Sequence, residues 1–266
     1  MIVEKTIQFI LDKYALQYRN TTIEKIICGA TFTAVQLSNG YCGLAKTECN
    51  EPAMHGHRRK ESLYLPGNIK GNKVLDFLKY HSNENYLDII KLATINALSA
   101  EIMAKANYHI IENKDPLELV DITNKRIAMV GAFCSYIRKL SQMPCTLKVL
   151  ELNANAFEKE YIHLYIPAER FNEIFSNADI VIITGSTLAN HTMEQLLSEV
   201  PKNATVIVVG PTSGILPEFL FEQQVSIIGA TQVIDADKLF SVIAEGGAAY
   251  HLFDGGAARK ICILHE

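Results

Sequence analysis

The spacing of hydrophobic residues divides the chain into a first part of mixed helix and strand and a second part in which strands and helices alternate. In the first part, apolar residues at helical spacing before Tyr14 predict an amphipathic helix. Short apolar segments then predict the strands of an antiparallel meander: 23–28, 32–37 and 41–45. Asn39-Gly40 supports a hairpin because both residues tolerate positive φ. Residues 74–80 and 86–106 predict helices, and the second is apolar on most sides and therefore buried.

The second part begins after a change of composition at 112–116. Segments with strand and helix patterns then alternate: 126–130, 133–140, 147–152, 168–175, 180–183, 191–199, 205–209, 216–222, 225–228 and 236–244. Such alternation predicts a doubly wound parallel sheet. The predicted fold class is therefore α/β, with a smaller α+β domain at residues 1–112 and a Rossmann-like domain at 113–266.

Two polar loops follow apolar strands in the second part. The β-branched run 180–183 is typical of a strand covered on both faces. The residues after it are small and polar and precede a helix predicted to begin near His191: Thr184, Gly185, Ser186, Thr187 and Asn190. The strand 205–209 is followed by Gly210, Pro211, Thr212 and Ser213. Ligands bind at the carboxyl ends of parallel strands and helix N-termini favour anions, so we expect these loops to bind an anionic group of a ligand. Ordinary helix capping uses the same residue types.

The first strand-to-helix turn of the second part is the usual position for a dinucleotide. It consists of G-A-F-C-S-Y at 131–136 and lacks two of the three fingerprint glycines. Phe133 would crowd a pyrophosphate, so we do not expect NAD to bind, while Gly131 and Phe133 remain candidate ligand contacts. Glu151, at the end of the second strand, could bind ribose hydroxyls or be a solvated carboxylate. Cys134 begins a predicted helix, and a buried inert thiol is the favoured interpretation.

Candidate metal ligands gather in the irregular stretch 46–72. Soft metals prefer thiolate and imidazole ligands, and the densest set of these is Cys49, His55 and His57. We therefore consider these residues as ligands of a divalent heavy or transition metal. Their spacing matches no recognised zinc pattern, so a surface loop without a metal is the competing interpretation.

Composition excludes several classes of protein. The 266 residues carry a formal charge of −4 and form no dense basic stripe, which argues against nucleic acid as a partner. Charged residues interrupt the longest apolar segment and no signal-peptide pattern precedes it, so we expect a cytoplasmic protein with no membrane partner. The 6 cysteines contain no C-x-x-C pair and are expected to be free thiols. A homodimer is compatible with the sequence.

Several segments together resemble one protein family. They are V-G-A-F at 130–133, L-E-L at 150–152, A-D-I-V-I-I-T-G-S-T-L-A-N-H-T-M-E at 178–194, and V-V-G-P-T-S-G-I-L-P-E-F-L-F-E at 208–222. With A-T-I-N-A-L-S-A at 93–100, they are similar to the family named for putative heavy-metal chelation. The resemblance covers nearly the whole chain. It implies an enolase-N-terminal-like domain, a Rossmann-like domain, a site at their junction, and a role in binding heavy metals or metal-containing cofactors.

We therefore expect a protein that binds a small molecule or metal complex, with its pocket at the interdomain carboxyl edge of the sheet. Two alternatives remain open: an enzyme acting on an anionic or adenosine-containing molecule, and a non-catalytic sensor or carrier. Neither polar loop contains an evident nucleophile with a base beside it, so Ser186 and Ser213 are predicted to bind a ligand and not to react with it.

Overall fold

The computed structural model describes residues 1–47, 63–81 and 84–265. Its contacts define two compact units. The first contains Met1–Asn107, Gly214–Leu216 and Thr231–Arg259, and the second contains Tyr108–Ser213, Pro217–Ala230 and Lys260–Glu266.

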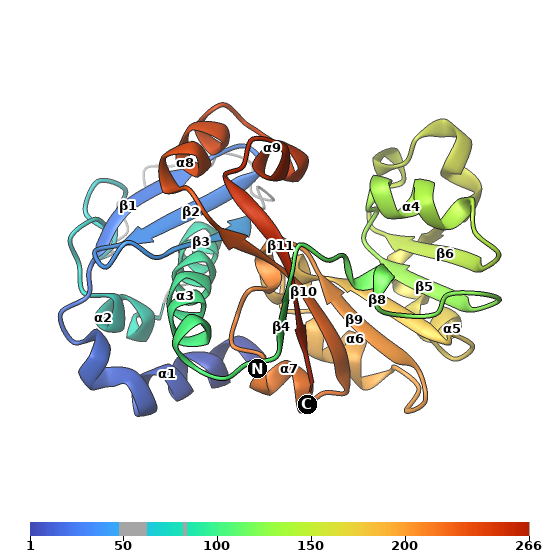
Figure 1. The fold of residues 1–266 in the computed structure, drawn as a ribbon, viewed down its shortest axis with the longest axis horizontal. Helices are drawn as coiled ribbons and strands as arrows, with labels where there is room; N and C mark the ends of the chain where they lie inside the picture. Colours follow the sequence, from blue (N-terminus) through green and yellow to red (C-terminus); the bar gives the residue numbers. More distant parts are fainter. Residues whose placement is uncertain (48–62, 82–83, 266) are drawn as a thin grey trace. The chain divides into compact units, whose positions relative to one another are not determined.

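The first unit is an antiparallel meander packed against helices (Figure 1). Its elements are α1 (Ile2–Tyr18), β1 (Ile23–Cys28), β2 (Phe32–Leu37), β3 (Cys42–Lys46), α2 (Val74–Lys79), α3 (Asn85–Lys105), α8 (Ala236–Ala244) and α9 (Ala249–Asp254). The three strands pair in the order β1-β2-β3, which confirms the predicted meander. Helix α3 approaches β3 closely at Gly43, where a Cβ atom would lie 2.2 Å from the Ala93 carbonyl oxygen.

Two polar residues of the buried helix α3 bond to other segments of this unit. Asn96 donates from Nδ2 to the Leu44 carbonyl oxygen at 2.8 Å. The Glu101 carboxylate accepts hydrogen bonds from Gln17, Asn39 and Lys105. These bonds tie α3 to the hairpin turn and to α1, which explains how charged residues occupy a buried helix.

Helices α8 and α9 pack on the meander. Leu239, Phe240 and Ile243 share a buried cluster with Phe32 and Leu44. The sequence predicted a division between residues 112 and 113, which placed 231–259 in the second domain. The compact units place this stretch in the first unit. The sequence showed that α8 has an apolar face, but periodicity does not specify which sheet that face covers.

The second unit is built on a mostly parallel sheet of the order β4-β11-β10-β9-β8-β5-β6-β7. The strands are β4 (Ile110–Glu112), β5 (Arg126–Val130), β6 (Thr146–Glu151), β7 (Tyr165–Pro167), β8 (Ile180–Thr184), β9 (Thr205–Val209), β10 (Val225–Val233) and β11 (Ala258–Leu264). All pairs from β7 to β10 are parallel, and β4 is antiparallel to β11. Counted from β5, the order of the parallel strands is that of the Rossmann fold.

Short helices connect these strands. The α-helices are α4 (Cys134–Ser141), α5 (Phe171–Phe175), α6 (Met193–Ser198) and α7 (Glu218–Phe221). The 3₁₀ segments are η1 (Pro116–Glu118), η2 (Ala154–Ala156), η3 (Lys159–Leu164), η4 (Ala168–Arg170), η5 (Gly185–Leu188) and η6 (Pro211–Ser213). The predicted alternation is confirmed, although several helices are shorter than the apolar pattern suggested.

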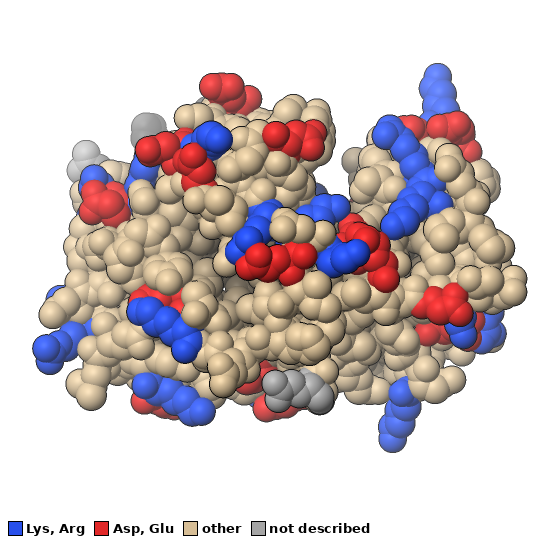
Figure 2. Space-filling view, viewed as in Figure 1, with Lys and Arg blue, Asp and Glu red and all other residues tan. Residues whose placement is uncertain are grey.

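Basic and acidic side chains are interspersed in small groups on the face shown in Figure 2. The ion pairs of the described residues include Arg126 with Asp179 at 2.7 Å and Arg170 with Glu173 at 2.7 Å. Hydrogen bonds from Arg126 hold the pKa of Asp179 well below its usual range. Within the described part of the chain, no helix has the length and apolar character needed to cross a membrane.

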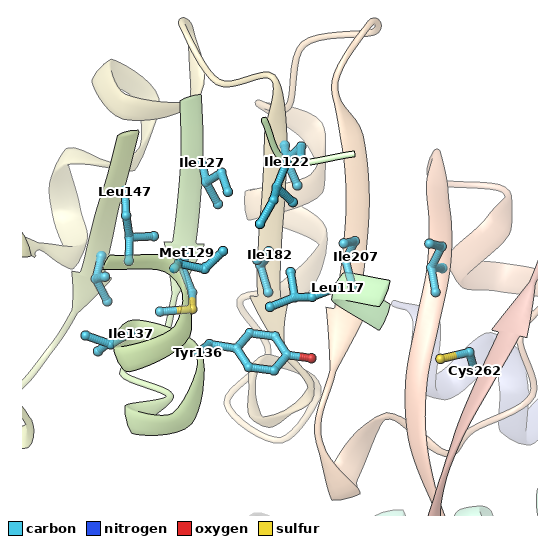
Figure 3. Packing of buried hydrophobic residues seen from close by; sticks show 14 residues of the cluster. Leu117, Ile122, Ile127, Met129, Tyr136, Ile137, Leu147, Ile182, Ile207 and Cys262 are labelled. Carbon is cyan, nitrogen blue, oxygen red and sulfur yellow. The ribbon is translucent and has the colours of Figure 1, made fainter. Parts of the chain in front are cut away.

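The core of the second unit is a layer of aliphatic side chains from neighbouring strands (Figure 3). Ile127 and Met129 of β5 project to the same face, since alternate residues of a strand share a face. Ile182 and Ile207 continue this layer across β8 and β9, and Leu117 packs on it. This packing fixes the positions at which β5, β8 and β9 end, and their loops contain most of the predicted site residues.

Candidate functional site

The strand order reverses between β5 and β8, and the two loops that leave these strands meet there. From β5 the chain continues to β6 on one side, and from β8 to β9 on the other. Ligands of open α/β sheets bind in the crevice at such a reversal. Gly131 follows β5 with φ +95°, and a Cβ atom there would lie 3.2 Å from Cβ and Cγ2 of Thr184. The ring of Phe133 is also adjacent, with Cε2 at 3.7 Å from the same point.

The turn after β5 uses its backbone amides inside the protein. Gly131 N donates to the Leu150 carbonyl oxygen at 2.9 Å, and Phe133 N donates to the Gly131 carbonyl oxygen at 3.1 Å. Ala132 N donates to Oε2 of Glu151 at 2.9 Å. The amides of Gly131, Ala132 and Phe133 therefore have acceptors inside the protein, which agrees with the expectation that this turn does not bind the pyrophosphate of NAD.

Glu151 closes this turn through hydrogen bonds to the backbone. Its second oxygen, Oε1, accepts from Leu152 N at 2.8 Å and from Asn153 N at 3.1 Å. Both carboxylate oxygens accept backbone hydrogen bonds. Glu151 is therefore not simply a solvated carboxylate, and its oxygens are not both free to bind a ribose. Sequence reasoning identified the residue but missed its bond to Ala132, which joins two strand ends that only the fold brings together.

The loop after β8 uses much of its polarity to stabilise its own backbone. Thr184 Oγ1 accepts from Ser186 N at 3.3 Å, and Thr187 Oγ1 donates to the Thr184 carbonyl oxygen at 2.7 Å. Asn190 is exposed, and its Oδ1 accepts from the Thr192 hydroxyl at 2.7 Å. The capping interpretation therefore describes Thr184, which caps η5, and Asn190, whose Oδ1 also accepts from Thr192 N.

The helices after β8 and β9 begin two residues later than predicted, at Met193 instead of near His191 and at Glu218 instead of Leu216. Residues directly after these strands form the 3₁₀ segments η5 and η6, and helices α6 and α7 begin only at Met193 and Glu218. Pro217 disfavours helical conformation in the residue before it, which delays α7. Segments this short align few peptide dipoles, so the anion binding predicted from helix dipoles loses its basis here.

The loops after β8 and β9 pack directly on each other. Strands β8 and β9 are paired, which confirms that the loops are neighbours. A Cβ atom on Gly185 would lie 2.7 Å from Ser213 N and 3.0 Å from Ser213 Cβ. The Ser213 hydroxyl lies 2.6 Å from the Gly210 carbonyl oxygen and 2.8 Å from that of Gly229 in β10, so it donates to the backbone of its own loop or of the neighbouring strand. Together the two loops form a closely packed wall.

Burial separates the predicted site residues into three groups. Gly185, Thr187, Thr212 and Ser213 are buried. Those that are partly exposed are Gly131, Phe133, Glu151, Thr184, Ser186, Gly210 and Pro211. Asn190 is exposed. The partly exposed group can contact a ligand, whereas the buried group supports it.

Cys134 and Ser135 are exposed at the start of α4, so the expectation of a buried Cys134 was wrong. The buried face of α4 consists of Tyr136, Ile137 and Leu140, and Cys134 lies off this face. Helical periodicity could have shown this. The first turn of α4 has no side-chain cap.

A partly buried network holds the first turn of α4 in place. The Tyr136 hydroxyl donates to Asp115 Oδ1 at 2.6 Å, and Lys260 Nζ donates to Asp115 Oδ2 at 2.9 Å. Burial raises the pKa of Asp115, but these hydrogen bonds outweigh it and the pKa is lowered. Its partners are distant in sequence, so the pattern of residues gave no indication of the network.

The predicted metal ligands Cys49, His55 and His57 lie outside the described residues. Across 1–47, 63–81 and 84–265, no three His, Cys, Asp or Glu side chains are placed to hold a metal ion. The described cysteines are free thiols. Burial raises the pKa of Cys42 and of Cys262 to about 11, so these two are poor soft-metal ligands at neutral pH.

Comparison with known families decides the relationship that the motifs suggested. The model of the DUF364 family, described as putative heavy-metal chelation, matches residues 115–262. The chain belongs to the DUF364 family. A second model with the same description, DUF4213, matches residues 11–99. The resemblance inferred from the sequence is therefore confirmed.

Other DUF364 proteins share the fold along their whole length. Crystal structures of family members of unknown function from Pyrococcus horikoshii and Desulfitobacterium hafniense each superpose with a TM-score of 0.75. They are 21% and 20% identical to this chain, cover 99% of it, and are themselves covered to 98% and 97%. An uncharacterised protein of Methanocaldococcus jannaschii is 27% identical over 228 residues, which is 82% of this chain and 79% of that protein.

Proposed function

We propose that this DUF364 protein binds a small molecule or a metal complex in the crevice between the loops after β5 and β8. The observation that carries the proposal is the reversal of strand order at this point, where Gly131 and Thr184 meet at the carboxyl edge of the sheet. The predicted position of the pocket relative to the small domain stays a prediction.

The residues around the crevice have different tasks in this proposal. Phe133 offers a partly exposed ring, whose centroid is 5.7 Å from that of Tyr136. Thr184 and Ser186 offer partly exposed hydroxyls beside it, while buried Ser213 stabilises the wall. One apolar surface with a few polar groups is the usual composition of a small-molecule site.

We further propose that the ligand is a heavy metal or a metal-containing cofactor, because both family models carry that description. The exposed thiol of Cys134 at the start of α4 is a soft ligand that could complete the coordination of a metal complex. Cys49, His55 and His57 remain the proposed ligands of a metal in their own segment. The proposal does not include turnover of the ligand.

A cytoplasmic location and a homodimer remain expectations from the sequence, and we propose neither nucleic acid nor a membrane as a partner. The mixed charges of the face in Figure 2 agree with this proposal, since phosphate backbones require a basic surface. Light scattering on the purified protein would determine the oligomeric state.

Native mass spectrometry and elemental analysis of protein purified without chelators would test the proposed function. Ser186→Trp fills the crevice, and Ser176→Trp places the same side chain at the exposed end of α5. We expect bound mass in the parent and in Ser176→Trp, and none in Ser186→Trp. Equal bound mass in both variants, with both folded, would place the ligand elsewhere.

A further inference from the structure

Two carboxylates are hydrogen-bonded to the loop after β5: Asp115, which also pairs with Lys260, and Glu151. The loops 131–136, 184–192 and 210–213 contain no Lys, Arg, Asp or Glu. The described partners of the Glu151 carboxylate are three backbone amides, and no cationic side chain pairs with it within the described residues. Unlike Asp115, Glu151 thus places beside the turn after β5 a negative charge with which no described cationic side chain is paired.

The Glu151 carboxylate accepts the hydrogen bond of a backbone amide that a phosphate would otherwise use. In dinucleotide-binding folds, the turn after the first strand directs backbone amides at the pyrophosphate. Here Glu151 Oε2 accepts from Ala132 N at 2.9 Å, in the middle of that turn. Leu152 N and Asn153 N hold the other oxygen, which fixes the orientation of the carboxylate.

We propose that Glu151 makes the crevice reject phosphate-type anions and select a neutral or cationic ligand; this inference rests on the proposed function, which locates the ligand there. A phosphate oxygen would have to displace the carboxylate from Ala132 N or approach it as a like charge. Either event weakens the binding of a phosphate. The same negative charge favours a cation or a positively charged complex.

Two variants of Glu151 separate its charge from its hydrogen bond. Glu151→Gln removes the charge and keeps one oxygen that can accept from Ala132 N. Glu151→Ala removes the charge and also releases that amide. Glu160→Ala is the matched control, since it removes one negative charge from an exposed position in η3.

The probe is inorganic pyrophosphate without magnesium, titrated calorimetrically into each protein. We expect no measurable binding to the parent or to Glu160→Ala. Affinity should rise about tenfold or more in Glu151→Gln, as expected for removing one like charge at close range, and further in Glu151→Ala. Alkylation of Cys134, which follows this turn, reports where pyrophosphate binds and should slow when it does.

Folded Glu151 variants that bind pyrophosphate no better than the parent would overturn the inference, as would a gain without protection of Cys134. If both variants fail to fold, the parent still decides: micromolar pyrophosphate binding that protects Cys134 would contradict the role of Glu151. None of these results bears on whether the purified protein carries bound mass. The proposed function is tested separately, by the bound mass of Ser186→Trp.

Discussion

The loop after β5 and the paired loops after β8 and β9 follow parallel strands of the same sheet but are built in different ways. The loops after β8 and β9 stabilise each other, with Gly185 in contact with Ser213 and their hydroxyls bonded within the loops. The loop after β5 is held by side chains from distant segments, through Glu151 and through Asp115 on Tyr136. Residues after a strand can therefore form a closely packed wall, as after β8 and β9, or a turn that distant side chains hold, as after β5.

Adding a Cβ atom at Gly185 should have the largest effect, because this residue packs closely in the wall formed by the loops after β8 and β9. In Gly185→Ala, the new Cβ atom would lie 2.7 Å from Ser213 N, so backbone must move. We expect a loss of about 2–3 kcal/mol in the free energy of unfolding, as for other overpacked positions. Urea denaturation would measure it.

Gly214→Ala is the control for Gly185→Ala, because its nearest contact would be an ordinary 3.6 Å to Asn96 Cγ. We expect it to change stability by less than about 1 kcal/mol. Equal losses in the two variants would show that the contact between the loops after β8 and β9 is not specific.

Removing the Tyr136 hydroxyl should have a smaller effect, on the side of the loop after β5. Tyr136→Phe deletes the bond to Asp115, and we expect a loss of about 1–2 kcal/mol at pH 7. The folded pKa of Asp115 is lowered, so its contribution exists above the unfolded value of about 3.9 and is lost as the pH falls through the folded value.

The difference in stability between parent and Tyr136→Phe should therefore narrow as the pH falls below about 4, where Asp115 takes up a proton. Denaturation of both proteins at a series of pH values would show this. A difference that stays constant over the series would mean that the hydroxyl acts by packing and not by stabilising the carboxylate.

Asn190→Ala should have the smallest effect. Its side chain is exposed and bonds to Thr192 within its own loop, so we expect a loss of about 0.5 kcal/mol and unchanged bound mass. Loss of the bound mass in this variant would instead support the sequence prediction that Asn190 contacts the ligand.

The sequence predicted the fold class because burial of parallel strands requires continuous apolar segments, such as 180–183. It did not predict that α8 packs on the meander, since an apolar face does not identify its partner. It also made the helices after β8 and β9 three residues too long, since it predicted 191–199 and 216–222 where the structure has Met193–Ser198 and Glu218–Phe221.

The candidate site could be predicted in its residues but not in its arrangement. Gly131, Glu151 and Thr184 were all identified from their positions after strands. The meeting of Gly131 with Thr184 depends on the strand order, and the bond from Ala132 to Glu151 depends on the pairing of β5 with β6. Both are long-range properties that local residue patterns do not contain.

A crystal structure of natively purified protein that carries bound mass would test the central claim most directly. The account predicts electron density for a non-protein group between the loops after β5 and β8, in contact with Phe133, Thr184 and Ser186. Density for that group in another part of the molecule, with only solvent in this crevice, would contradict it.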